Sequence, residues 1–141
     1  MTAKESKITT IPRFLVEVGE RDSYAANVQL PISGARISVG SEAVLSEYDI
    51  VDVKIAEVEY GRCLQFVLTR SASRDFYKTT TMNQGRRLVL LINGQAMGVR
   101  IIDRPIGDGV IFMFLEVSDD SLEELVKELK GSIVEIRKRL D

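Results

Sequence analysis

Two arginines, Arg87 and Arg100, have the clearest potential for binding chemistry in this sequence. They flank two apolar runs joined by Asn93 and Gly94, the dipeptide best suited to a two-residue type I′ hairpin turn. The register that this turn imposes places the two arginines directly opposite each other. Opposed like charges destabilise a hairpin unless an anion lies between them, so the pair could bind a ligand carboxylate. Alternatively, an acidic side chain such as Asp103 or Glu116 neutralises the pair, as is common on protein surfaces, or both arginines extend into water.

The same side of the predicted hairpin also carries apolar residues. The register places Val89, Leu91 and Ala96 beside the two arginines, while the opposite side faces the core. An apolar patch with charged neighbours on an open sheet face is typical of a partner surface. We therefore predict that a partner contacts Arg87, Arg100, Val89, Leu91 and Ala96. In the alternative interpretation, the N-terminal strands cover the three apolar residues.

The absence of histidine excludes several kinds of catalytic and metal site, whereas no residue that is present identifies a function. The chain has no imidazole metal ligand, no His general base and no Ser-His or Cys-His pair. Its single cysteine, Cys63, can form neither an internal disulfide nor a thiolate metal cluster, and we expect an inert thiol. We predict no catalytic residue, no cofactor and no metal. A small enzyme that uses Asp103, Asp108, Arg87 and Arg100 is the less favoured alternative, because carboxylates can act as general acids and bases.

Two further clusters have ordinary structural interpretations. Asp119, Asp120, Glu123 and Glu124 could hold a hard cation, but acidic residues also complement the positive end of a helix, and we prefer that interpretation. The glycines that precede Val110 do not form a phosphate loop, because a strand follows them and no helix dipole points at an anion.

Length and charge limit the architecture and the partners. A chain of 141 residues is the size of one ordinary domain, and we predict a mobile tail at residues 1–10 followed by a single domain at residues 11–141. The net charge of −2 provides no general attraction for phosphate backbones, so nucleic acid is not an expected partner. No stretch approaches the roughly 18 consecutive apolar residues of a membrane helix.

Short strands and two helices must position these residues. Alternating apolar residues predict short strands between Ile11 and Leu45 and a hairpin of Ile50–Ile55 with Leu64–Leu68. Val110–Leu115 is apolar at every position, which predicts a central strand covered on both faces.

The helices have recognisable ends. Ser71 is the expected N-cap of the first helix, which Gly85 ends. Asp120 and Glu123 resemble a capping box at the start of the last helix, whose apolar spacing also admits a homo-oligomer. Helices that follow runs of strands predict an α+β fold. We expect an antiparallel or mixed sheet with two helices packed on one face, in a ferredoxin-like or related arrangement.

Several motifs between Glu42 and Leu129 occur in the order found in a known family. They are Val44-Leu45, Asp49-Ile50, Phe76, Thr80, Asn83, Gly85-Arg86-Arg87-Leu88, Leu90, Ile92, Asn93-Gly94 and Pro105-Ile106. This arrangement resembles the head subdomain of the first periplasmic domain of SecD, a membrane subunit of the bacterial protein-export machinery. The segment from Phe14 to Val39 matches more weakly.

The resemblance implies a SecD-head-like fold and a non-catalytic module that binds polypeptide or a protein partner, linked to protein export. It implies a periplasmic or extracytoplasmic location and supplies no catalytic residue. SecD proteins have transmembrane helices that this sequence lacks, so the expected protein is a free-standing relative. A lipoprotein whose signal is absent from this numbering is one form that such a relative could take. A structural, self-associating envelope protein is the alternative role.

Overall fold

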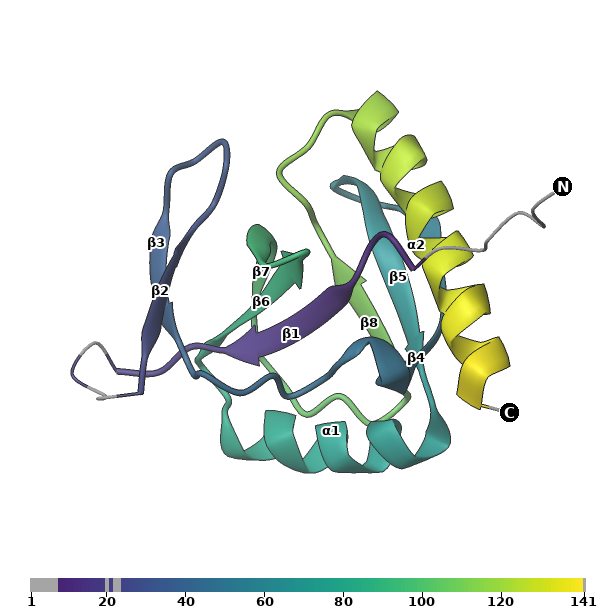
Figure 1. Ribbon diagram of the computed structural model, residues 1–141. Coiled ribbons are helices and arrows are strands. Elements are labelled where there is room, and N and C mark those ends of the chain that lie inside the picture. The colour runs from purple at the N-terminus through teal and green to yellow at the C-terminus, as the bar shows by residue number, and fades with distance from the viewer. Residues whose placement is uncertain (1–7, 20, 22–23, 141) are drawn as a thin grey trace, which may run out of the picture.

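Antiparallel strand pairing organises the chain, as the computed structural model shows for residues 8–19, 21 and 24–140 (Figure 1). The strands form two three-stranded sheets, β1–β6–β7 and β4–β5–β8, and a separate hairpin, β2–β3. Their bounds are β1 Pro12–Val16, β2 Ala26–Gln29, β3 Arg36–Val39, β4 Ile50–Val58, β5 Gly61–Leu68, β6 Arg87–Ile92, β7 Gln95–Ile101 and β8 Val110–Met113. The helices are α1 Arg70–Met82 and α2 Asp119–Leu140, with a short 3₁₀ turn, η1, at Glu47–Asp49.

The two three-stranded sheets meet at β7 and β8 and enclose the main core. An isolated bridge pairs Gly98 with Leu115, and the Glu116 N–H donates to the Met97 carbonyl at 2.8 Å. On the core side, the rings of Phe14 and Phe66 contact edge to face, with centroids 5.1 Å apart. These two phenylalanines, from β1 and β5, join the sheets across the core.

Both helices add side chains to this one core, which confirms the predicted α+β fold. Ala72 and Phe76 of α1 and Leu122, Val126, Leu129 and Ile133 of α2 belong to the same buried cluster. Their apolar residues recur at helical spacing, so each helix buries one stripe. Figure 1 shows α1 along one end of the sheets and α2 beside β4 and β5.

The helix starts differ from those predicted. Thr69 caps α1 and its hydroxyl accepts from the Ala72 N–H at 3.1 Å, so Ser71 lies inside the helix. For α2, Ser118 accepts from the Ser121 N–H at 3.2 Å. The helix therefore begins one residue before Asp120, which the sequence had indicated as the cap. In both cases another Ser or Thr two residues earlier supplies an equivalent oxygen.

The first described residues of the chain are hydrogen-bonded to the middle of α2. The N–H groups of Thr9 and Thr10 both donate to Ser132 Oγ, at 3.1 and 3.0 Å, and Thr10 is buried. The predicted tail therefore does not extend to Thr9 and Thr10, while its residues 1–7 lie outside the described residues. The hydroxyl of Ser132 is the acceptor that makes this attachment possible.

The Asn93-Gly94 hairpin is confirmed, but its register changes within the strands. Asn93 and Gly94 have φ values of 51° and 83°, as a type I′ turn requires. Leu91 pairs with Ala96 as predicted, but Leu90 pairs with Gly98, so Met97 is an extra residue in a β-bulge. Beyond the bulge every pair is shifted by one. The prediction that the two arginines oppose each other is wrong.

The β2–β3 hairpin covers the sheet face that was expected to be open. It contributes Leu30, Ile37 and Val39 to a second buried cluster with Leu15 of β1, and this cluster includes Val89 and Ala96. At the end of the hairpin, Glu116 Oε1 accepts from the N–H groups of Ile32 and Ser33 at 2.9 and 2.8 Å. These hydrogen bonds lower the pKa of Glu116. The hairpin is thus held at its turn as well as along its strands.

Candidate binding groove beside strand β8

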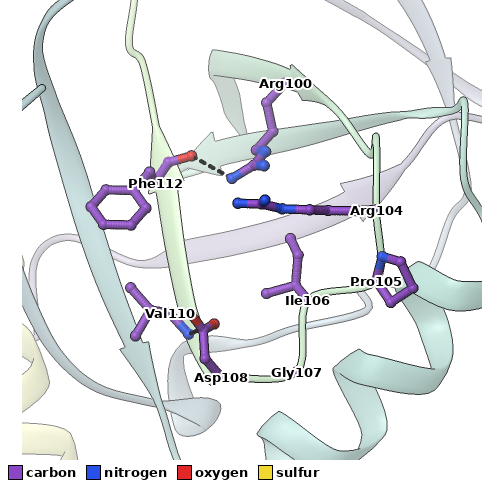
Figure 2. A pocket seen from close by; sticks show the side chains of 8 residues that line it. All are labelled: Arg100, Arg104, Pro105, Ile106, Gly107, Asp108, Val110 and Phe112. Carbon is purple, nitrogen blue, oxygen red and sulfur yellow. Dashed lines mark hydrogen bonds between the residues drawn. The ribbon is translucent and has the colours of Figure 1, made fainter. Parts of the chain in front are cut away.

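A cavity of about 290 Å³ opens beside β8, between this strand and the loop that follows β7 (Figure 2). It combines apolar walls with charged side chains. Its lining residues are Arg100, Arg104, Pro105, Ile106, Gly107, Asp108, Val110 and Phe112. Of these, Phe112 is 39% exposed although it lies within an apolar run. The prediction that both faces of Val110–Leu115 are covered is therefore wrong for its outer face.

Arg100 and Arg104 supply the positive charge of this cavity. Figure 2 shows both side chains directed toward β8 from the same side. Arg100 Nη1 donates to the Phe112 carbonyl at 3.1 Å, and its Nη2 lies 3.7 Å from Asp103 Oδ1. Within the part of the chain that the structure describes, the Arg104 side chain has no hydrogen bond or ion pair. Arg100 is thus positioned by protein contacts, whereas Arg104 is available.

The outer edge of β8 is protected against pairing with another strand. In an antiparallel pair, alternate residues direct their backbone groups away from the partner strand. The Leu68 N–H bonds to the Gly109 carbonyl, so Val110 and Phe112 direct theirs away from β5. Asp108 Oδ1 accepts from the Val110 N–H at 3.1 Å, and Arg100 occupies the Phe112 carbonyl. Side chains therefore occupy one outward backbone group of each of these two residues, which disfavours strand addition at this short edge.

A second, wider cavity of about 610 Å³ continues along α1. Gly107 lines both cavities and lies against the ring of Tyr77, where an added Cβ would be 3.0 Å from Cδ1. The α1 residues that line it are Arg70, Ser73, Arg74, Asp75, Tyr77 and Lys78. We call the two cavities together the β8–α1 groove. Its lining is basic and partly apolar, on a chain whose net charge is −2.

The predicted contact residues do not all lie in this groove. Arg100 lines it, but Arg87, at the start of β6, is outside its lining and pairs with Glu17 at 2.7 Å. Val89 and Ala96 are 0% and 2% exposed beneath the β2–β3 hairpin, so the expectation of an exposed patch is wrong. Leu91 packs against the same cluster and is partly buried. The alternative in which N-terminal strands cover these apolar residues is correct.

The groove contains two of the four residues of the enzyme alternative. Arg100 and Asp108 line it, and Asp103 lies beside Arg100, but Arg87 is bound elsewhere. Sequence reasoning missed Arg104, Phe112 and Tyr77 as groove residues. In the sequence, Arg104 could have been noticed only as a second arginine, four residues after Arg100 and directly before Pro105. Nothing in an apolar run distinguishes an exposed Phe112 from a buried one.

The remaining candidates have structural roles. Cys63 is fully buried, and this burial raises the pKa of its thiol, as an inert cysteine requires. Glu123 forms an ion pair with Arg62 at 3.0 Å. Among the described residues, no group of three Cys, Asp or Glu side chains could hold a metal ion.

The Arg87–Glu17 pair predicts an acid-dependent contribution to stability. Hydrogen bonding from the Arg87 guanidinium lowers the pKa of Glu17 below its ordinary value of 4.5. A lowered pKa in the folded state means that the pair stabilises the protein above about pH 4.5 and that this contribution is lost as pH falls through the folded-state pKa. We expect Glu17→Gln to reduce the fall in unfolding midpoint between about pH 5 and pH 3, measured by urea denaturation. An identical acid dependence in the variant and the wild type would show that the pair contributes nothing.

Comparison with known proteins identifies the fold. No family model and no curated protein matches the sequence. Solved structures do: one titled as a membrane component SecDF that enhances protein export aligns over 86% of this chain, with a TM-score of 0.65 and 14% identity. SecDF in a super-membrane-facing form aligns over 86%, with a TM-score of 0.67 and 15% identity. The fold is SecD-like.

A third structure supports the same assignment. SecDF from Thermus thermophilus, described as a translocon-associated membrane protein, aligns over 88% of this chain with a TM-score of 0.53 and 10% identity. The chain spans 62% of the length of the first matched structure and 19% and 29% of the other two. None of the helices in the described part of this chain has the length and apolar character needed to cross a membrane. The SecD-like fold predicted from the sequence motifs is therefore confirmed.

Proposed function

We propose that this chain is a non-catalytic module of the cell envelope that binds polypeptide or a protein partner and takes part in protein export. The observation that carries the proposal is the SecD-like fold, which extends over 86% of the chain. A matched structure is that of a component that enhances protein export. The accompanying extracytoplasmic location is tested by fractionating cells that express the native gene, and recovery only in the cytosol would contradict it.

The β8–α1 groove is the surface we assign to this binding. It offers exposed aromatic area, with Tyr77 50% and Phe112 39% exposed, next to several cationic side chains. Aromatic and arginine side chains are the residue types that dominate protein-binding surfaces. The sheet face around Val89 is covered by the β2–β3 hairpin and offers no comparable area.

Replacing Phe112 by aspartate is expected to weaken polypeptide binding at least about fivefold, because loss of an interface anchor costs about 1 kcal/mol or more. The measurement is fluorescence anisotropy with labelled α-lactalbumin that has been reduced and carboxamidomethylated, so that it stays unfolded. Equal unfolding midpoints for the variant and the wild type must accompany the comparison.

Val134→Asp provides the matched control. Val134 is 54% exposed on α2, outside the lining of both cavities, so the same change in charge and apolar area should leave binding unaltered. If the wild type does not bind the unfolded polypeptide and captures no envelope protein, the proposed function is wrong. If both variants lose affinity equally, binding does not use the groove.

The self-associating alternative depends on α2. Leu140 is 51% exposed, but Ile133 and Ile136 are buried and Arg137 Nη1 donates to the Tyr48 carbonyl at 2.9 Å. The end of α2 is thus attached to its own domain beside η1. A homo-oligomer through this helix stays a prediction, and sedimentation at several concentrations tests it.

A further inference from the structure

The cavity beside β8 has an unbalanced charge at its arginine pair. Arg100 and Arg104 bring two positive charges to its lining, and Asp108 brings one negative charge. Asp108 already accepts a hydrogen bond from the Val110 N–H, and Asp103 approaches Arg100 only to 3.7 Å with its side chain 68% exposed. An exposed ion pair of this length is weak, and Asp103 does not line the cavity. The lining thus retains about one positive charge for a ligand.

The two arginine side chains differ in how firmly the protein holds them, and this difference suits a binding site. The Arg100 side chain is 24% exposed and is fixed by its bond to the Phe112 carbonyl. This bond uses Nη1, and a guanidinium has five N–H donors in all, so most of its donors remain for a ligand. Arg104 reaches the same cavity without an acceptor among the described residues. One positioned arginine and one adaptable arginine can close on a single anionic group.

The walls around this pair are apolar. Pro105 and Ile106 lie on the same side of β8 as the two arginines, whereas Figure 2 shows the side chains of Val110 and Phe112 across β8 from them. A small inorganic anion would leave these walls uncovered. An anionic group attached to an apolar chain would contact both the arginines and the walls.

We propose that Arg100 and Arg104 bind a carboxylate of the bound polypeptide, with a neighbouring apolar residue of that polypeptide placed against Pro105 and Ile106. This inference rests on the proposed polypeptide-binding function and names the group that the groove recognises. A carboxylate carries one negative charge, which matches the residual charge of the lining, and its two oxygens accept paired hydrogen bonds from guanidinium groups. A phosphate near neutral pH carries about 1.5 to 2 negative charges, more than the net positive charge of this cavity's own lining.

Three labelled apolar peptides of the same length test the inference by fluorescence anisotropy. The first has an amidated C-terminus and no acidic side chain, the second has a free C-terminal carboxylate, and the third is amidated with one internal glutamate. We expect one or both carboxylate peptides to bind about tenfold more tightly than the first, since hydrogen bonds to charged groups are worth about 1.5–3 kcal/mol. The second and third peptides distinguish a terminal carboxylate from a side-chain carboxylate.

Arg104→Gln identifies the site within the protein. This variant should remove the difference between the peptides while retaining affinity for the amidated one, because the apolar walls are unchanged. Arg139→Gln, in the exposed last turn of α2, is the matched control and should preserve the difference. Inorganic phosphate at matched ionic strength should compete no better than acetate.

The outcomes separate the inference from the function on which it rests. If all three peptides bind equally, the carboxylate site is wrong and polypeptide binding stands. If none binds, the proposed function fails and the inference fails with it. Loss of the difference in Arg139→Gln, or stronger competition by phosphate than by acetate, would also overturn the inference.

Discussion

Replacing Phe66 by alanine is expected to lower the free energy of unfolding by about 3–5 kcal/mol, the usual cost of deleting a buried aromatic ring. Phe66 lies on β5, is fully buried and contacts Phe14 of β1 edge to face at 5.1 Å. Its loss would leave a cavity in the main core, where side chains of both three-stranded sheets are buried together. Chemical denaturation followed by circular dichroism measures the effect.

A double-mutant cycle isolates the contact between the two rings. Combining Phe66→Ala with Phe14→Ala should reveal a coupling of about 0.5–1.5 kcal/mol, the range for aromatic pairs beyond their buried area. Tyr60→Ala is the control, because Tyr60 is 85% exposed in the β4–β5 turn and its loss should change stability by no more than about 0.5 kcal/mol. Additive losses for the two phenylalanines would show that the sheets are not coupled through this pair.

The parts of the fold that depend on local sequence could be predicted. Asn and Gly adopt positive φ more readily than other residues, so the hairpin turn followed from Asn93 and Gly94. The stripe of apolar residues on α2 likewise fixed which side of that helix is buried. The ordered motifs from Val44 to Ile106 were sufficient to predict the SecD-like fold.

The register of the same hairpin could not be predicted, because it depends on a distant strand. Met97 bulges where its carbonyl accepts the Glu116 N–H, and Gly98 then lies against the end of β8. The bulge shifts every pair beyond it by one, so that Arg100 pairs with Leu88 instead of Arg87. A single residue of register thus separated two arginines that local geometry had placed together.

The candidate site was likewise predictable only in part from the sequence. Arg100 was identified from the sequence as a contact residue. The reason was that it was expected to oppose Arg87, which it does not do. Arg104 joins it only because the loop after β7 folds back toward β8, which no periodicity indicates. The apolar run at Val110–Leu115 was equally consistent with a buried strand and with a strand whose outer face binds a partner. Exposure of Phe112 depends on the absence of a covering layer, and that is a property of the whole fold.

Replacing Gly98 by alanine tests the junction between the sheets. An added Cβ at Gly98 would lie 2.7 Å from the carbonyl oxygen of Phe114 and 3.0 Å from Met113 Cγ. The first of these atoms belongs to the backbone, so β7 and β8 must separate to accommodate the methyl group. Overpacking of this kind costs about 1–3 kcal/mol, and we expect a loss in that range by chemical denaturation.

The same substitution at Gly131 is the control, with an expected effect of opposite sign. Gly131 lies inside α2, and an added Cβ there meets nothing within 4 Å. Alanine should therefore stabilise the helix by about 0.5–1 kcal/mol, because glycine loses more backbone entropy on folding. Gly98 lies where β7 meets β8, two residues before Arg100 of the cavity lining. Gly98→Ala should therefore weaken polypeptide binding, whereas Gly131→Ala should not. Equal stability changes at the two positions would mean that the junction is not close-packed, and unchanged binding in a destabilised Gly98→Ala variant would mean that the groove does not depend on it.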